Sequence, residues 1–305
     1  MTDAIYCSEC GKKNNDEDIE CRYCGSTLKT GNIVTKREIK SFEELVTQEN
    51  LDMLKQTKFT PTAYNTILEE ILRIGYDKFT YNDNLTVLDN VYLLAEQYTH
   101  VYSKHKGNEL GVYSTNDIYV DERRPEAQKT STLIHELTHH LYYEIYEQWM
   151  MYALKVKKSI YIEAFVLFTL QFPLFKTFNE YIAHTTQSKF EKPGCQGYGS
   201  FIKLRKDYGL DLNKFKEHFA YGRAVSEDIT MIIEQFLDEK VREKIVKQFE
   251  IDNIAVINQI EIEDLDIMSQ KDTAASMGLI LIDAMSEALK YEKSMEYLKS
   301  LEQLF

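Results

Sequence analysis

Two histidines four residues apart, with a glutamate directly after the first, are the side chains in this 305-residue chain best suited to hold a metal ion. His135, Glu136 and His139 form the pattern HExxH. Residues i and i+4 share one face of a helix, so both imidazoles can reach one zinc ion. Glu136 would point beside the metal, where its carboxylate can take a proton from a water molecule that zinc activates. We therefore predict a catalytic zinc site with Glu136 as general base.

Apolar residues at helical spacing surround this motif and predict a long helix that begins after Pro125. They are Leu133, Ile134, Leu137, Leu141, Tyr142 and Ile145. His140 directly follows His139 and lies about 100° around such a helix. We expect His140 to take no part in metal binding.

A catalytic zinc site has three protein ligands and one open position, so a third donor must come from elsewhere in the chain. Glu180 is the best candidate, in the segment Asn-Glu-Tyr-Ile-Ala-His that ends at His184. His184, one helical turn later, could orient a ligand histidine from behind it. Glu163 is the alternative ligand, although a glutamate at the start of an apolar helix is also an ordinary first-turn acid.

HExxH followed by this segment resembles the gluzincins, zinc peptidases whose second helix carries NExxxD. In that family the glutamate binds zinc and the aspartate supports a ligand histidine. The resemblance implies that Glu180 is a ligand, and it leaves open whether His184, at the position of the aspartate, supports a ligand or binds the metal itself. The metzincin pattern HExxHxxGxxH is absent, because Tyr142 and Ile145 occupy its glycine and last histidine positions.

Two short β-prone runs, residues 111–113 and 118–120, are separated by a turn-like segment, so we expect a small hairpin or sheet edge before the HExxH helix. A strand at this place recurs in zinc peptidases, where an edge strand pairs with an extended substrate. We expect residues 118–120 to be that strand. The order of strand, HExxH helix and Glu-bearing helix is similar to the ImmA/IrrE-type metallopeptidases, which cut phage-type repressors.

Four of the five cysteines lie in two CxxCG knuckles near the N-terminus: Cys7, Cys10, Cys21 and Cys24. Four thiolates complete the closed tetrahedral shell of a structural zinc ion, whereas a redox function would need one CxxC pair at a strand-to-helix junction. Residues 6–28 resemble the short zinc ribbons at the head of many prokaryotic proteins, which implies a docking or interaction module. Cys195 is expected to be an ordinary loop or core residue.

The chain divides into a zinc ribbon (residues 1–28), a polar linker (29–40) and a zincin-like domain (41–305) with a helical C-terminal half. Only four Pro and twelve Gly indicate a mainly α, α+β fold with a small sheet. Ser41 and Glu44 form a capping box at the first helix. Residues 160–178 are expected to form one buried helix, because charged residues and Pro173 interrupt them too often for a membrane span. Residues 228–249 and 274–301 have amphipathic helical spacing.

The net charge of -13 argues against extensive binding to nucleic acid, which requires clustered lysine and arginine. The N-terminal residues lack the basic and apolar segments of a secretory signal, and cysteines in metal-binding pairs are typical of a reducing compartment. We therefore expect a cytoplasmic protein that is not in a membrane.

These features predict an intracellular zinc endopeptidase with one catalytic and one structural zinc ion, acting on a protein or peptide substrate. The ribbon would bind a protein partner. The alternative is a non-catalytic interaction protein in which zinc is structural and the ribbon does the recognising. A third hypothesis is a zinc hydrolase with a non-peptide substrate. The sequence leaves the residue that stabilises an oxyanion open among Tyr198, Tyr221 and His218.

Overall fold

The computed structural model describes residues 36–76, 78–107, 109–195, 197–210, 216–255 and 273–305. It also gives the backbone of two short antiparallel strands, β1 (Ile5–Tyr6) and β2 (Lys13–Asn14). For Tyr76 and residues 216–218 the backbone alone is described. The four ribbon cysteines and the predicted boundary at residue 28 lie outside the described residues.

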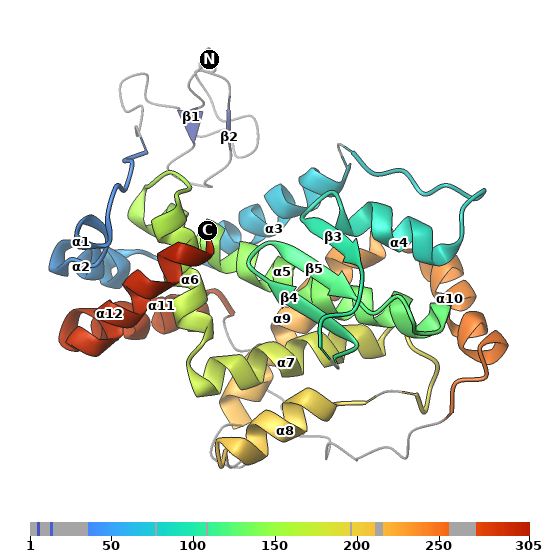
Figure 1. The fold of residues 1–305 in the computed structure, drawn as a ribbon. Coiled ribbons are helices and arrows are strands. Elements are labelled where there is room, and N and C mark those ends of the chain that lie inside the picture. The colour runs from blue at the N-terminus through green and yellow to red at the C-terminus, as the bar shows by residue number, and fades with distance from the viewer. Residues whose placement is uncertain are drawn as a thin grey trace. The chain divides into compact units, whose positions relative to one another are not determined.

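The chain is mainly helical, as predicted, and forms two compact units (Figure 1). The first unit comprises Met1–Glu70, Ile145–Thr169 and Asp272–Phe305, and the second comprises Ile71–Glu144 and Leu170–Lys271. The helices α3 (Pro61–Tyr76) and α5 (Glu126–Leu154) contribute residues to both units. The other helices of the first unit are α1 (Phe42–Leu45), α2 (Gln48–Gln56), α6 (Ile160–Leu170), α11 (Thr273–Lys290) and α12 (Glu292–Leu301), which the 3-10 turn η1 (Glu302–Leu304) follows.

The first unit is organised around an aromatic core and a capped first helix. Trp149 is fully buried, and its ring packs against Phe59 at 5.1 Å and Tyr64 at 6.1 Å between centroids. The Ser41 side chain accepts a hydrogen bond from the Glu44 backbone N–H at 3.2 Å, which starts α1. The predicted capping box is incomplete, because the Glu44 carboxylate accepts from the backbone N–H of residue 40 instead of that of Ser41.

A three-stranded sheet belongs to the second unit, with strand order β3 (His100–Ser103), β5 (Asp117–Val120), β4 (Gly111–Ser114). The hairpin predicted from residues 111–120 is confirmed, since β4 and β5 are antiparallel. Strand β3 was not predicted, and it pairs parallel with β5. Residues 118–120 therefore lie in the central strand, and the prediction that they form a sheet edge is wrong. Both sides of β5 are already paired, so the substrate-pairing position expected there is taken by protein backbone.

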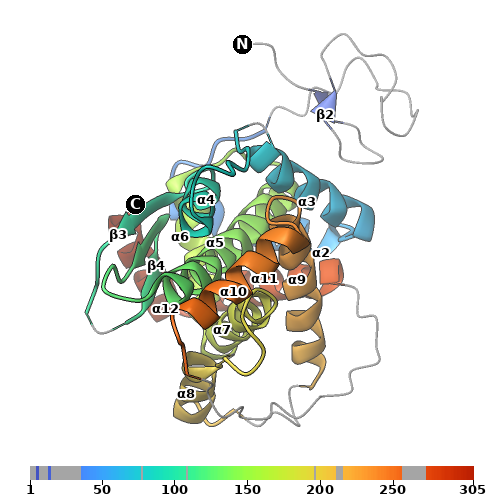
Figure 2. The ribbon, with the colours of Figure 1, turned by 90° about the vertical axis from the view of Figure 1, so that its right-hand side faces the viewer.

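Alternation along the strands decides which face of the sheet meets α5. Gly111 and Tyr113 on β4 pair with Val120 and Ile118 on β5, and the latter two are fully buried. These residues share one face, and the Tyr113 ring packs against Tyr143 on α5 at 6.4 Å. The sheet thus lies along α5 (Figures 1 and 2). This packing brings the start of β4 close to the HExxH motif.

Helix α7 (Pro173–Ser188) lies beside α8 (Gly199–Asp207) and α9 (Lys216–Glu234), and aromatic side chains fill the space between them. This cluster contains Phe178, Tyr181, Phe201 and Phe219. The second unit also contains α4 (Val87–Ala95) and α10 (Glu239–Ile251). Both amphipathic C-terminal segments are helical, and each is divided between two helices: α9 with α10, and α11 with α12.

The prediction of one buried helix over residues 160–178 is wrong, because the segment is divided between α6 and α7. Pro173 occupies the first turn of α7, where its missing N–H removes no intrahelical hydrogen bond. Among the described residues, no single helix has the length and apolar character needed to cross a membrane, although the bent pair α6 and α7 meets that criterion jointly.

Candidate metal centre

Two imidazoles and one carboxylate, from two helices of the second unit, lie close together. The Nε2 atoms of His135 and His139, on α5, lie 3.1 Å apart. Glu180, on α7, places Oε2 at 3.5 Å from His135 Nε2 and Oε1 at 3.6 Å from His139 Nε2. A tetrahedral zinc ion with bonds of about 2.0–2.2 Å separates its ligand atoms by about 3.3–3.6 Å. The two distances to Glu180 lie in this range and the distance between the two Nε2 atoms is slightly shorter, so the three side chains are spaced about as one zinc ion requires.

The second nitrogen of each histidine is held by an amide from α7. His139 Nδ1 donates to Asn179 Oδ1 and His135 Nδ1 donates to Gln187 Oε1, both at 2.8 Å. An amide oxygen only accepts, so each Nδ1 carries the proton and each Nε2 presents a lone pair. Two lone pairs and a carboxylate facing one another repel unless a cation lies between them. The chemistry of the donor set, as well as its spacing, suits a bound metal.

Two of the three donors, His139 and Glu180, hold the protonation state that a cation needs. Burial lowers the pKa of His139 to about 4, which keeps that imidazole neutral. Burial also disfavours charge on Glu180, but the neighbouring His139 and the hydrogen bond with His135 prevail and lower its pKa. For His135, burial is opposed by the hydrogen bond with Glu180 and by the charge of Glu136, and its pKa is raised. A bound cation would displace the proton that His135 attracts in its absence.

Glu136 directly follows His135 on α5 and takes no part in the contacts between His135, His139 and Glu180. It is buried, and burial raises its pKa to about 7, while a hydrogen bond from the Tyr113 backbone opposes the shift. The backbone of Gly111 on β4 also lies against Glu136, since a Cβ atom added at Gly111 would lie 2.7 Å from Glu136 Oε1. The carboxylate is thus held between α5 and the backbone of β4, in a position to exchange a proton near pH 7.

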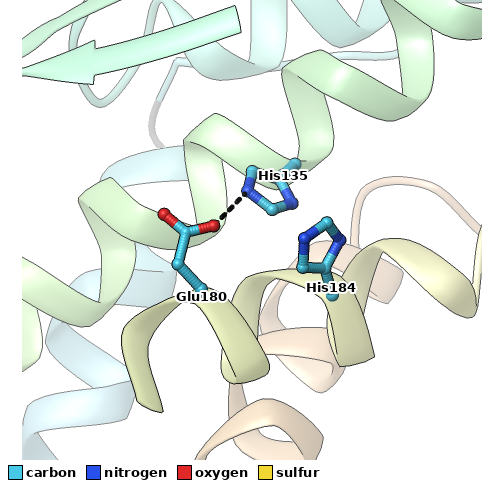
Figure 3. Close-up of side chains that lie close together, drawn as sticks. All are labelled: His135, Glu180 and His184. Atoms are coloured by element: carbon cyan, nitrogen blue, oxygen red, sulfur yellow. Dashed lines mark ion pairs between the residues drawn. The ribbon is translucent and has the colours of Figure 1, made fainter. Parts of the chain in front are cut away.

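His184 contacts the ligand histidine His135, as the sequence suggested, and also supports Glu180 through Ser200. Ser200, at the start of α8, donates to Glu180 Oε2, and His184 Nε2 donates to Ser200 Oγ at 2.7 Å. Burial lowers the pKa of His184 to about 3, so it is neutral. Figure 3 shows His184 beside His135, with ring centroids 4.5 Å apart. A ring nitrogen of His184 also lies within 4.8 Å of the ligand atoms of His135 and Glu180, which makes His184 a possible fourth ligand.

The alternative ligand, Glu163, belongs to the first unit and forms an ion pair with Lys158 at 3.3 Å. His140 is buried, and its Nδ1 lies 3.4 Å from the Tyr113 hydroxyl. Cys195 is buried, which raises the pKa of its thiol and agrees with an ordinary core residue.

The three residues considered for oxyanion stabilisation have different surroundings. The Tyr221 hydroxyl is buried 3.2 Å from the Tyr142 hydroxyl. The Tyr198 ring packs on His184 at 5.3 Å, which puts it next to the centre. The side chain of His218 lies outside the described residues. Of the two described tyrosines, only Tyr198 borders the metal centre.

A second group of possible ligands, His105, Asp121 and Glu122, does not need a cation. The Asp121 carboxylate is buried and already binds two guanidinium groups, at 2.7 Å to Arg123 and 3.2 Å to Arg124. These hydrogen bonds and charges lower the pKa of Asp121. Because its charge is already compensated, this group is a poor metal site.

Several residues of the centre were missed by the sequence analysis. Gln187 had a detectable signal, since it lies two helical turns after Glu180 and therefore on the same face of α7. Ser200 and Gly111 had none, because their positions depend on how α8 and β4 pack against other elements.

Residues 6–28 match the family described as a zinc-ribbon domain. This is the range over which the two cysteine knuckles resemble zinc ribbons. No curated protein and no solved structure matches the chain. The chain therefore carries a zinc-ribbon domain at its N-terminal end, and the second unit contains a group of histidine and glutamate side chains suited to a metal.

Proposed function

We propose that the protein is a zinc-dependent endopeptidase in which His135, His139 and Glu180 hold the zinc ion. The observation that carries this proposal is the close approach of their ligand atoms: the two Nε2 atoms lie 3.1 Å apart, and the two Glu180 oxygens lie 3.5 Å from His135 Nε2 and 3.6 Å from His139 Nε2. An amide oxygen accepts from Nδ1 of each histidine. When bound, zinc would lower the pKa of a water molecule to about 7 and polarise the carbonyl under attack. Tetrahedral sites with three protein ligands leave a position for that water.

Glu136 would accept the proton of the attacking water and pass it to the leaving amine. A general base works best when its pKa is near the working pH, and the pKa of Glu136 is raised to about 7. Burial and the Tyr113 backbone fix the carboxylate, so that the proton transfer requires little reorganisation.

The peptide substrate would pair with β4. Within the part of the chain that the structure describes, β4 pairs with β5 on one side and no strand pairs with its other side. The start of β4 adjoins Glu136 through Gly111. An extended peptide added to this edge would gain backbone hydrogen bonds beside the general base. We further propose that the zinc ribbon binds a protein partner and brings the enzyme to its target.

The alternative is a zinc site without catalysis, closed by His184 as fourth ligand. It is supported by the donor atom of His184, which lies within 4.8 Å of those of His135 and Glu180. The hydrogen bond from His184 Nε2 to Ser200 uses that nitrogen as a donor, so the fourth lone pair would come from His184 Nδ1, which is buried and has no hydrogen-bond partner within the described part of the structure. A closed shell would leave no position for water.

Zinc content of the purified full chain tests the site. We expect about two zinc ions in the wild type and about one in Glu180→Gln. Glu163→Gln is the matched control, since it changes the alternative ligand, and it should keep about two. A wild type with the ribbon zinc alone would contradict the proposal.

Catalysis is tested by incubating the chain with a mixed peptide library and identifying products by mass spectrometry. Glu136→Gln should keep its zinc and lose cleavage. If His184→Ala loses the second zinc and no variant cleaves any peptide, the closed, non-catalytic site is correct. Cleavage of esters or of N-acylated sugars without cleavage of peptides would favour a zinc hydrolase with a non-peptide substrate.

A further inference from the structure

A buried carboxylate outside the metal centre is connected to it by two short hydrogen bonds. Glu191 lies just after α7 and is 7% exposed. Its Oε1 accepts from Gln187 Nε2 at 2.6 Å, and Gln187 Oε1 in turn accepts from His135 Nδ1 at 2.8 Å. Ser131, one helical turn before His135, also forms a hydrogen bond with Glu191. Glu191 is therefore tied to α5 directly and to His135 through one amide.

An amide such as that of Gln187 can turn over and exchange its oxygen for its NH₂ group. If the NH₂ group faced His135, Nδ1 would have to accept, and the ring proton would move to Nε2. That tautomer has no lone pair toward the metal position. An ionised carboxylate only accepts, so Glu191 in that form keeps the NH₂ group of Gln187 on its own side. The oxygen of Gln187 is thereby directed at His135.

We propose that Glu191 is a positioning residue of the zinc site: by orienting Gln187 it fixes the tautomer of His135 that can bind metal. The inference rests on the proposed function, because it assigns Glu191 a task in the same site. The residue that the gluzincin pattern would use for support, His184, is hydrogen-bonded to Ser200. The support of His135 comes from Gln187, one turn further along α7, and from the carboxylate behind it.

The test is the zinc affinity of this site in the full chain, measured by competition with a chromophoric chelator. Loss of a residue that supports a ligand histidine costs about 10–100-fold in metal affinity. We expect a weakening in this range for Gln187→Met, which removes the acceptor at similar size, and for Glu191→Leu. Glu191→Gln should fall between wild type and Glu191→Leu, because its amide can accept but can also donate. The ribbon zinc, as internal reference, should keep its affinity.

A double-mutant cycle separates positioning from a general loss of structure. Because Glu191 acts through Gln187, the double variant should be no weaker than Gln187→Met alone. Nitrogen-15 shifts of the His135 ring, measured in metal-free protein at a pH high enough to make the ring neutral, should show protonation at Nδ1 in the wild type and a mixture of tautomers in Glu191→Leu. Glu227→Gln, on an exposed carboxylate of α9, is the matched control for Glu191→Gln and should change neither readout.

Unchanged affinity for the second zinc in folded Gln187→Met and Glu191→Gln would overturn the inference, as would losses that add in the double variant. Should Glu191→Leu fail to fold, the zinc affinities of Gln187→Met and Glu191→Gln still decide whether Glu191 and Gln187 support the zinc site. A wild type that binds no second zinc is a different result, since it would remove the proposed function itself.

Discussion

Gly111 on β4 lies so close to the Glu136 side chain that a methyl group added at Gly111 would displace Glu136. A Cβ at Gly111 would lie 2.7 Å from Glu136 Oε1, 3.0 Å from Glu136 Cγ and 2.4 Å from Thr132 Cγ2. Side chains on α5 therefore meet the backbone of β4 with no space between them. The absence of a side chain at Gly111 is what lets the carboxylate rest against the strand.

Gly111→Ala is expected to displace Glu136 and to reduce peptide cleavage at least tenfold, about 1.4 kcal/mol in transition-state stabilisation, while zinc content stays unchanged. The measurement pairs zinc analysis with the rate of library cleavage. Gly199→Ala is the control, because a Cβ there meets nothing within 4 Å. Loss of zinc from Gly111→Ala would instead show that the strand holds the ligands.

Glu191 makes the stability of the chain depend on pH. Burial raises its pKa to about 7 from an ordinary value of 4.5. Between these pH values the folded chain holds a proton that the unfolded chain has released, so this contribution is fully present below about pH 4.5 and is lost as the pH rises through about 7. Glu191→Gln cannot titrate, so its unfolding midpoint should fall less over this range. Urea unfolding of chelator-treated protein at several pH values measures the difference, and parallel pH profiles would refute it.

The hairpin turn between β4 and β5 carries backbone strain at Thr115. Thr115 has φ 43° and Asn116 has φ 66°, and a β-branched residue is poorly suited to this left-handed region. Thr115→Asn should raise the free energy of unfolding by about 0.5–1 kcal/mol. Chemical denaturation checks this, with Thr115→Val, which keeps the branching, expected to bring no gain. A loss of stability in Thr115→Asn would mean that the threonine side chain contributes more than its strain costs.

A buried charge in the first unit depends on Lys158. The Glu147 side chain is fully buried and lies 2.8 Å from Lys158 Nζ, which is about half exposed. Lys158→Met should destabilise the chain by about 1–3 kcal/mol, because it removes a charged partner from a buried carboxylate. Thermal unfolding should show part of this loss restored in the double variant with Glu147→Gln. A single variant as stable as the wild type would show that water replaces the lysine.

The sequence predicted those parts of the fold that depend on local pattern. The helix after Pro125 and the hairpin of residues 111–120 follow from apolar spacing and turn residues, and both are present. Strand β3 was missed because it is short and mostly exposed, so it lacks the alternation that marks a half-buried strand. Its parallel pairing with β5 is a long-range contact that no local pattern encodes.

The candidate site also contains residues that local spacing predicts and residues that only packing determines. The spacing of His135 and His139 on one helix predicts both histidines as ligands, and the segment around Glu180 predicts that glutamate as the third ligand. The carboxylates of Glu163 and Glu180 looked alike in sequence, and what distinguishes them is packing. Glu163 is paired with Lys158, whereas Glu180 faces two imidazoles. The hydrogen bonds through Ser200 and Gln187 come from folding and could not be read from residue types.

Both histidines of the centre are held from behind by neutral amides, Asn179 and Gln187. Carboxylates in these places would donate electron density through the rings and cancel most of the charge of a divalent ion. With amides, Glu180 is the sole anion in contact with both imidazoles among the described residues, and a zinc ion there would keep one formal positive charge. Such an electron-poor ion attracts an anionic oxygen strongly. The same property would make small anions and hydroxamate compounds good ligands of a zinc ion held there.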